Sequence, residues 1–147
     1  MSFQVTWDAG DPHAQARFWA ATLGYALEEH EEFIRGLLHR DVITDDQTIL
    51  VDGVLHFRTA VAIRPDGAGQ EQAVQSGNRL LFMKVPEPKT VKNRVHLDVK
   101  VGPGLREAEV QRLEGLGARV LDEHDDAEGR WTVMADPEGN EFCVSGR

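Results

Sequence analysis

The segments LGYALEEH, residues 23–30, and LGARVLDEH, residues 116–124, place the same pattern at two points of the chain. Each begins with a Leu-Gly pair behind a stretch of helical spacing, continues with apolar residues, and ends in acidic residues and a histidine. Glycine at this point suits the left-handed residue that ends many helices. We interpret the two segments as equivalent parts of a duplicated unit, with chance similarity as the alternative.

The residues before the first segment predict a strand and then a helix. Residues 3–9, FQVTWDA, alternate between apolar and polar side chains, which is typical of a half-buried strand. Asp11 and Pro12 suit the N-cap and the first position of a helix, and apolar residues then recur with helical spacing as far as Leu23. Residues 25–30 are predicted to form a second strand.

The remainder of the first half is less regular. Residues 31–54 contain the pattern of a short helix and a loop, and we interpret them as an insertion. Residues 55–64 alternate as a strand, whereas residues 65–77 are rich in glycine and polar residues and are predicted to form a loop. Residues 79–85 predict the last strand of this half.

The second half repeats this order of elements. Residues 95–101 alternate as a strand, and a helix follows whose apolar side carries Val110, Leu113 and Leu116. Further strands are predicted over residues 118–124, 130–135 and 140–145, and the last two are joined by a turn at 136–139. Both halves therefore run strand, helix, strand, strand, strand, which predicts an α+β fold.

Composition limits the class of protein. The 147 residues suit one compact unit or two small halves that share a core, and no apolar run approaches the roughly 20 residues that cross a bilayer. The first residues do not resemble a signal peptide, so we expect a cytoplasmic protein that does not bind membranes. The single cysteine, Cys143, excludes a disulfide within the chain.

The net charge of -9 argues against nucleic acid as a partner, because a polyanion is repelled by an acidic surface. A basic cluster between Lys84 and Arg94 is interrupted by Glu87 and contains no aromatic residue. We interpret that cluster as a solvated connection between the two halves.

The duplicated unit and three stretches of sequence resemble the vicinal oxygen chelate superfamily, and within it the glyoxalase-like domain branch. The stretches are DAGDPHAQARFWAATLGY at 8–25, RLLFMKVPEPKTVKNRVHLDV at 79–99 and ADPEGNEFCV at 135–144. The resemblance implies one domain over residues 1–147, in which two βαβββ modules form a cupped mixed sheet. Module one would span 1–90 with the insertion 31–54, and module two 91–147. Relatives in this superfamily often pair, so we also expect a homodimer.

The resemblance also implies where metal ligands would lie. The ligand position of the first strand falls on Gln4, that of the fifth strand on His96, and the usual glutamate of the last strand on Cys143. No carboxylate or histidine occurs within 79–85, where the fourth ligand would lie. We therefore expect no cofactor and no tightly held divalent metal. If a metal binds, we expect His96 to hold it together with Glu141 and Gln4.

His96, Asp98 and Glu141 are the candidate catalytic residues. One imidazole near two carboxylates can supply a general acid and a general base. The alternative is a histidine that is hydrogen-bonded to either carboxylate and has no catalytic role, with the carboxylates solvated at a rim. We expect the side chains of Gln4, Asp8 and Cys143 to line the same pocket. We expect an unreactive thiol at Cys143, because nearby acidic residues would raise its pKa.

These features predict a protein that binds a small polar molecule in the cavity of the cupped sheet. The protein would be a lyase, an isomerase or a dioxygenase, or it would be a non-catalytic binding protein of the drug-resistance type. The weakened ligand set favours a function without metal, but it does not separate catalysis from binding.

Overall fold

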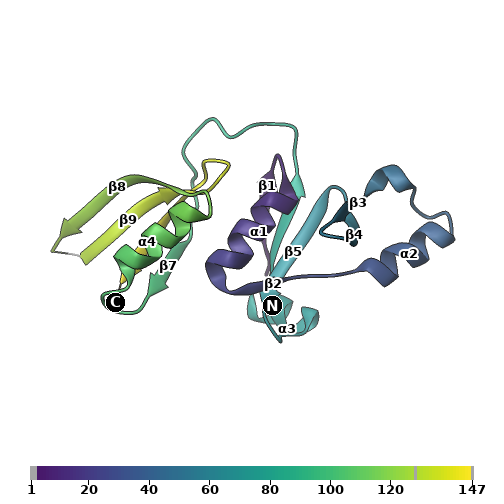
Figure 1. Ribbon diagram of the computed structural model, residues 1–147, viewed down its shortest axis with the longest axis horizontal. Helices are drawn as coiled ribbons and strands as arrows, with labels where there is room; N and C mark the ends of the chain where they lie inside the picture. Colours follow the sequence, from purple (N-terminus) through teal and green to yellow (C-terminus); the bar gives the residue numbers. More distant parts are fainter. Residues whose placement is uncertain (1–2, 128, 147) are drawn as a thin grey trace. The chain divides into compact units, whose positions relative to one another are not determined.

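The computed structural model describes residues 3–127 and 129–146, and it forms two compact units, Met1–Glu87 and Pro88–Arg147. Each unit contains a four-stranded sheet with a helix along one face, α1 in the first unit and α4 in the second (Figure 1). Among the described residues, no helix combines the length and the apolar character needed to cross a bilayer.

The sheet of the first unit has the strand order β1-β6-β5-β2. Its strands are β1 (Val5–Ala9), β2 (Tyr25–Leu27), β5 (Ala60–Pro65) and β6 (Leu80–Lys84), and β1 runs parallel to β6 while the other pairs are antiparallel. Helix α1 (Pro12–Leu23) covers one face through Trp19, whose ring lies 5.2 Å from that of Trp7. Trp7 in turn stacks on Phe82 at 5.9 Å, so one aromatic cluster joins the helix to β1 and β6.

Helix α1 begins and ends where the sequence predicts. The Asp11 side chain accepts hydrogen bonds from the backbone N–H groups of His13 and Ala14, at 3.1 and 3.0 Å. Pro12 occupies the first turn, where its missing N–H costs nothing. Gly24 ends the helix with φ of 67°, a conformation that glycine adopts without strain.

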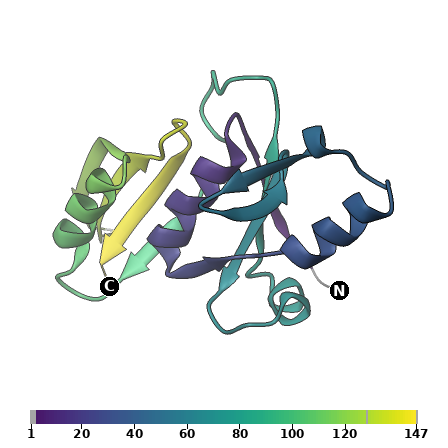
Figure 2. The same cartoon turned by 45° about the vertical axis from the view of Figure 1, so that its right-hand side comes forward.

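The segment between β2 and β5 contains more structure than predicted. Helix α2 (Glu31–His39) confirms the expected short helix, and the 3₁₀ turn η1 (Asp45–Gln47) follows it. Strands β3 (Thr48–Val51) and β4 (Val54–Phe57) then form a two-stranded hairpin (Figure 2). The prediction of one strand over 55–64 is wrong, because β4 and β5 are separate strands. Asp52 and Gly53 turn the hairpin with φ of 52° and 85°, and an Asp-Gly pair between apolar runs is the signal that could have revealed it.

The predicted loop over 65–77 is also wrong in part. Helix α3 (Gln70–Ser76) lies within it, with Ala73 buried and Gly77 closing the helix at φ of 72°. The polar composition of this stretch hides a run of good helix formers, since Gln, Glu and Ala all favour helix.

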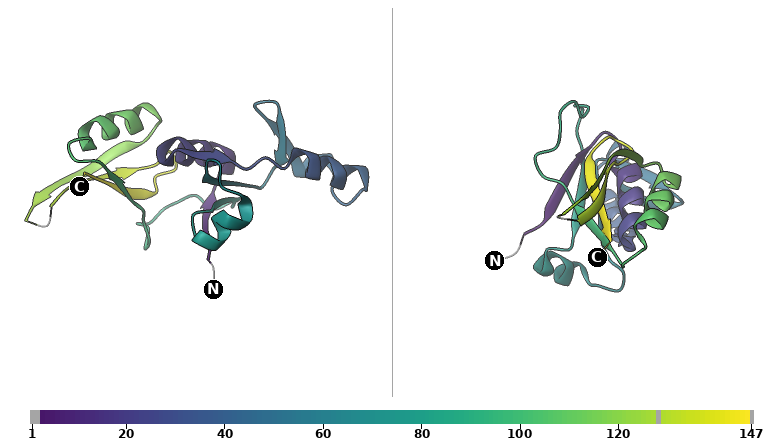
Figure 3. Two further views of the ribbon diagram at one scale, coloured as in Figure 1. Left: turned by 90° about the horizontal axis from the view of Figure 1, so that it is seen from below. Right: turned by 90° about the vertical axis from the view of Figure 1, so that its left-hand side faces the viewer.

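The second unit repeats the topology of the first. Its elements are β7 (Asp98–Val101), α4 (Arg106–Gly115), β8 (Arg119–Asp126), β9 (Gly129–Ala135) and β10 (Glu141–Gly146). The strand order β7-β10-β9-β8 matches that of the first unit, with β7 parallel to β10. Figure 3 shows α4 along one face of this sheet. The predicted α+β class and the strand–helix–strand–strand–strand order are therefore confirmed in both units.

Strand β7 begins at Asp98, three residues later than the alternation over 95–101 predicts. Val95 is 80% exposed, so an apolar residue at this position does not mark a buried strand face. His96 consequently lies in the irregular segment immediately before the strand.

The turn between β9 and β10 depends on one buried carboxylate. Asp136, only 2% exposed, accepts hydrogen bonds from the backbone N–H groups of Glu138 and Asn140, at 3.0 and 2.9 Å. The Asn140 side-chain amide donates to both of its oxygens, at 3.1 and 2.9 Å. The conspicuous Asp-Pro-Glu-Gly-Asn sequence thus has a structural role that fixes the start of β10.

Replacing this carboxylate should destabilise the protein substantially. Asp136→Ala removes the acceptor for several buried donors, which is expected to lower the free energy of unfolding by about 2–4 kcal/mol. Urea unfolding followed by circular dichroism measures the change. Asp66→Ala, at an exposed turn position in the first unit, serves as the control and should change stability by less than about 0.5 kcal/mol. Equal losses in both variants would contradict the role given to Asp136.

Candidate functional site

The second unit has a pocket on the sheet face opposite α4. Val99, Phe142 and Val144 are buried beneath the helix, and alternate residues of a strand point to opposite faces. Asp98, Cys143 and their neighbours at two-residue spacing therefore project from the other face. The resulting cavity of about 340 Å³ is lined by His96, Asp98, Lys100, Trp131, Cys143 and Ser145.

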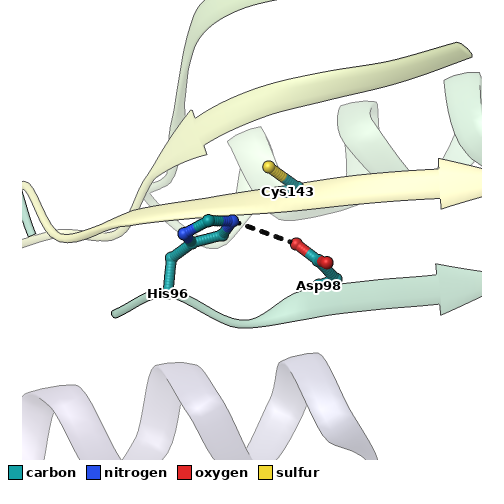
Figure 4. Close-up of side chains that lie close together, drawn as sticks. All are labelled: His96, Asp98 and Cys143. Atoms are coloured by element: carbon teal, nitrogen blue, oxygen red, sulfur yellow. Dashed lines mark ion pairs between the residues drawn. The ribbon is translucent and has the colours of Figure 1, made fainter. Parts of the chain in front are cut away.

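Asp98 is the centre of the polar groups in this pocket. Its Oδ1 lies 3.3 Å from His96 Nε2 (dashed line in Figure 4), and one donor atom each of Asp98, His96 and Cys143 lie within 4.8 Å of one another. The parallel pairing of β7 with β10 sets Asp98 directly opposite Cys143. The Cys143 N–H donates to Leu97 O at 2.9 Å, which extends this pairing one residue toward His96. The backbone register thus brings the three side chains together.

The Cys143 thiol is not activated. Burial raises the pKa of Cys143, and the negative charge and hydrogen bond of Asp98 raise it further, while Lys92 acts weakly in the opposite direction. A thiol with a raised pKa stays protonated at neutral pH and is a poor nucleophile. The sequence-based expectation of a raised pKa at Cys143 is therefore confirmed.

Trp131 forms an aromatic wall of the pocket. The structure places this residue among those that line the cavity. Its ring stacks on His124, with ring centroids 4.6 Å apart and planes 12° from parallel. This stacking holds the indole on β9 in a defined orientation.

Glu141 is engaged by other partners than His96. Its carboxylate accepts hydrogen bonds from Lys89 Nζ at 3.1 Å and from the Asn93 backbone N–H at 3.0 Å. Burial acts to raise the pKa of Glu141, but the Asn93 N–H, its own N–H and Lys89 together outweigh burial and lower that pKa to about 2. Glu141 does not line the cavity. Through these hydrogen bonds, Glu141 holds the segment before β7 against the start of β10.

Gln4 and Asp8 belong to the first unit, whereas the residues around the pocket all come from the second. Gln4 Oε1 accepts a hydrogen bond from Arg79, whose guanidinium also pairs with Glu28 at 2.8 and 2.9 Å. Glu28 is 2% exposed. Burial acts to raise its pKa, but Arg79 and His30 outweigh that effect and lower it. Asp8 is an exposed residue of β1, and a cavity shared by Gln4, Asp8 and His96 stays a prediction.

Residues 4–145 match the model of a family described as the glyoxalase-like domain. The chain belongs to this family. It aligns with a fosfomycin resistance protein FosX from Mesorhizobium loti at a TM-score of 0.61 and 10% identity, covering 99% of this chain and 90% of that one. A bleomycin-binding protein from Streptomyces verticillus, complexed with copper(II)-bleomycin, aligns at 0.51 and 15% identity, covering 100% and 96%.

FosX from Listeria monocytogenes, complexed with Mn(II) and 1S,2S-dihydroxypropylphosphonic acid, aligns at 0.59 and 12% identity, with 100% and 90% covered. At these identities the likeness concerns the fold, which this glyoxalase-like domain shares with the fosfomycin resistance and bleomycin-binding proteins. No functionally curated protein matches the sequence significantly.

The donor set of this glyoxalase-like domain suits one class of metal ion better than another. One donor atom each from His96, Asp98 and Cys143 lie within 4.8 Å of one another, and they combine nitrogen, oxygen and sulfur. Such a set suits a borderline ion such as Zn²⁺, whereas Mn²⁺ and Mg²⁺ prefer oxygen. The sequence predicted that Glu141 and Gln4 would join His96 as ligands if a metal binds. In the structure, Glu141 accepts hydrogen bonds from Lys89 and Asn93, and Gln4 accepts one from Arg79.

Two further pocket residues, Lys100 and Ser145, were missed in the sequence. Lys100 follows Asp98 by two residues and Ser145 follows Cys143 by two, so strand parity alone places them on the same face. The register pairs the two directly across β7 and β10. Their position was accessible from the sequence once one residue on each strand had been assigned to the pocket.

The low pKa of Glu141 predicts a pH-dependent stability. The folded-state pKa of about 2 lies below the ordinary value of 4.5, so the carboxylate stabilises the protein above pH 4.5 and this contribution is lost as pH falls toward 2. Glu141→Gln should lower the free energy of unfolding at pH 7 by about 1–2 kcal/mol, and the difference from wild type should shrink below pH 4.5. Urea unfolding across this pH range measures it. The control is Glu87→Gln, at an exposed position in the segment between β6 and β7, and it should show no such pH-dependent difference.

Proposed function

We propose that the pocket around His96 binds a small polar molecule. The observation that carries this proposal is the convergence of hydrogen-bonding, cationic and aromatic groups on one cavity of about 340 Å³, a size suited to a small ligand. Lys100 would attract a negatively charged group, Trp131 would stack on a flat or apolar part, and His96 with Asp98 would hydrogen-bond to hydroxyl or carbonyl groups.

The His96–Asp98 pair supports proton transfer to or from such a ligand. If His96 Nε2 donates to Asp98, the second ring nitrogen is left with a lone pair that can accept a proton. A carboxylate in this position also stabilises the imidazolium that forms. The enzymatic form of the proposal is therefore a lyase or isomerase in which His96 is the general base and Asp98 orients it.

The second candidate is a binding protein without chemistry. It is supported by the protonated Cys143, because this thiol does not supply an activated nucleophile. Two structural neighbours are compatible with either form, since one is a fosfomycin resistance protein and the other a bleomycin-binding protein. Turnover of a stabilising ligand, followed by NMR, separates the two candidates.

We further propose that the pocket operates without a tightly held metal. An ion that binds Cys143 would have to displace the thiol proton. Burial and Asp98 both raise the pKa of this thiol and so oppose that displacement. The His96 and Asp98 side chains are also 45% and 57% exposed, so water competes for both donors. If an ion does bind, His96, Asp98 and Cys143 would hold it, and it would act there as a Lewis acid toward the ligand.

A ligand-stabilisation screen tests the proposed function. Chelator-treated protein is heated with a panel of small carboxylates, phosphonates, hydroxyketones and aromatic amides, with and without Zn²⁺, Mn²⁺, Ni²⁺ and Fe²⁺. A ligand present at about 100 times its Kd should stabilise the wild type by about 2.7 kcal/mol. His96→Ala should reduce this stabilisation, because it removes a pocket-lining hydrogen-bonding group. The control His39→Ala, an exposed histidine at the end of α2, should leave it unchanged.

Ligand stabilisation that is equal in wild type and His96→Ala would show that the ligand binds elsewhere. A separate result would refute the proposal that the pocket operates without a tightly held metal. It fails if the purified protein holds one equivalent of metal that His96→Ala removes, or if ligand binding requires an added ion that His96→Ala no longer retains.

We also propose a homodimer. Each four-stranded sheet has two edge strands, β1 and β2 in the first unit and β7 and β8 in the second, and edge strands favour association. Phe33 and Leu50 expose 59% and 65% of their surface on α2 and β3, and a partner subunit would cover such apolar groups. Light scattering should give twice the chain mass of 16.4 kDa at micromolar concentration. A single-chain mass throughout that range would refute the dimer.

A further inference from the structure

The first unit contains a second cavity that is separate from the His96 pocket. It encloses about 70 Å³ between the first turn of α1, the end of β2 and the β3–β4 hairpin. Two histidines, His13 from α1 and His56 from β4, form part of its lining, and Glu29 and Asp52 contribute carboxylates. Such a volume accommodates an ion with one or two water molecules, since a water molecule occupies about 30 Å³.

His13 is held in the tautomer that a metal ligand requires. The residue is 6% exposed, and its Nε2 lies 3.0 Å from the carbonyl oxygen of Phe57. A carbonyl oxygen only accepts hydrogen bonds, so Nε2 carries the proton and the neutral ring keeps its lone pair on Nδ1. Histidines that ligate metals in proteins are usually oriented in this way, by donating the other ring N–H to a carbonyl or carboxylate.

His56 is a buried imidazole without a hydrogen-bonding partner. It is 7% exposed, it lines the cavity, and neither of its ring nitrogens is hydrogen-bonded within the part of the chain that the structure describes. Its ring centroid lies 5.5 Å from that of His13, with the planes at 63°. Its ring nitrogens are not among the fully buried, unpaired atoms of the described residues, so an ion or a water in the cavity can reach them.

We propose that His13 and His56 bind one borderline divalent metal ion of the Zn²⁺ class. Imidazole nitrogens suit Zn²⁺, Ni²⁺ and Cu²⁺ better than Mg²⁺ or Ca²⁺, and two of them face one small cavity here. Water would complete the coordination, because the donor atoms of His13, His56 and Glu29, an exposed carboxylate at the rim, do not all lie within 4.8 Å of one another in the described structure. Asp52 is turned toward Arg17 at 4.0 Å and is not assigned to the ion. The ion would join α1 to the β3–β4 hairpin.

Cobalt titration tests this site directly. The probe is Co²⁺ added to the chelator-treated full chain in a His96→Ala/Cys143→Ser background, which removes the donors of the other cluster. One equivalent should bind, with visible d–d absorption and without a thiolate charge-transfer band. His13→Gln and His56→Gln should each weaken binding by more than about 100-fold, because loss of an outer-shell partner alone costs about 10–100-fold. His39→Gln is the matched control and should bind as the background does.

Glutamine is the informative replacement at these positions. Its amide N–H can still donate to Phe57 O from position 13, while the Nδ1 donor is lost. If His13→Gln does not fold, as judged by circular dichroism, His56→Gln decides the outcome. In a second measurement, Zn²⁺ should raise the Tm of the background protein and fail to do so in His56→Gln.

Two results would overturn the proposal. One is the absence of saturable Co²⁺ binding up to millimolar concentration in the folded background protein. The other is Co²⁺ binding that both glutamine variants leave intact. Neither result bears on ligand binding at His96, which is read from the metal-free arm of the screen and through a different variant.

Discussion

The parallel pairing of the first strand with the last in each unit is the constraint on which the rest of the structure depends. Strands β1 and β6, like β7 and β10, run in the same direction, so the chain between them must cross over the sheet. A helix makes this crossover and covers one face, through Trp19 in α1 and through Val110 and Leu113 in α4. The opposite face is left free of the helix, and there polar residues at two-residue spacing project together.

This pairing also sets the chemistry of the pocket. The register places Asp98 opposite Cys143 and Lys100 opposite Ser145, so donors from strands more than 40 residues apart in sequence meet on one surface. The bond from the Cys143 N–H to Leu97 O continues the pairing beyond β7, and Glu141 fastens the preceding segment through Asn93 and Lys89. His96 is positioned by these backbone contacts, although it lies outside regular structure.

The two units use the equivalent ends of their first and last strands differently. In the first unit, Gln4 before β1 contacts Arg79 before β6, and Arg79 is neutralised by the buried Glu28. In the second unit, His96 before β7 reaches Asp98, while Glu141 at the start of β10 turns to Lys89. At this position the first unit therefore contains an internal ion pair, whereas the second unit presents an imidazole and a carboxylate to a cavity. The β3–β4 hairpin, which the second unit lacks among its described residues, adds the His13–His56 cavity to the first.

The sequence by itself determined the order of the four sheet strands and the covering helix in both halves, the limits of α1 from Asp11 to Gly24, and the shared face of Asp98 and Cys143. These features follow from local rules, because capping, helical spacing and strand parity act over a few residues. The partners of Glu141 and Gln4 were decided only by tertiary structure. Each depends on contacts between residues distant in sequence: Lys89 lies 52 positions from Glu141, and Arg79 lies 75 from Gln4. No local pattern states which cation a carboxylate or an amide will meet, since that choice is made when the strands pair.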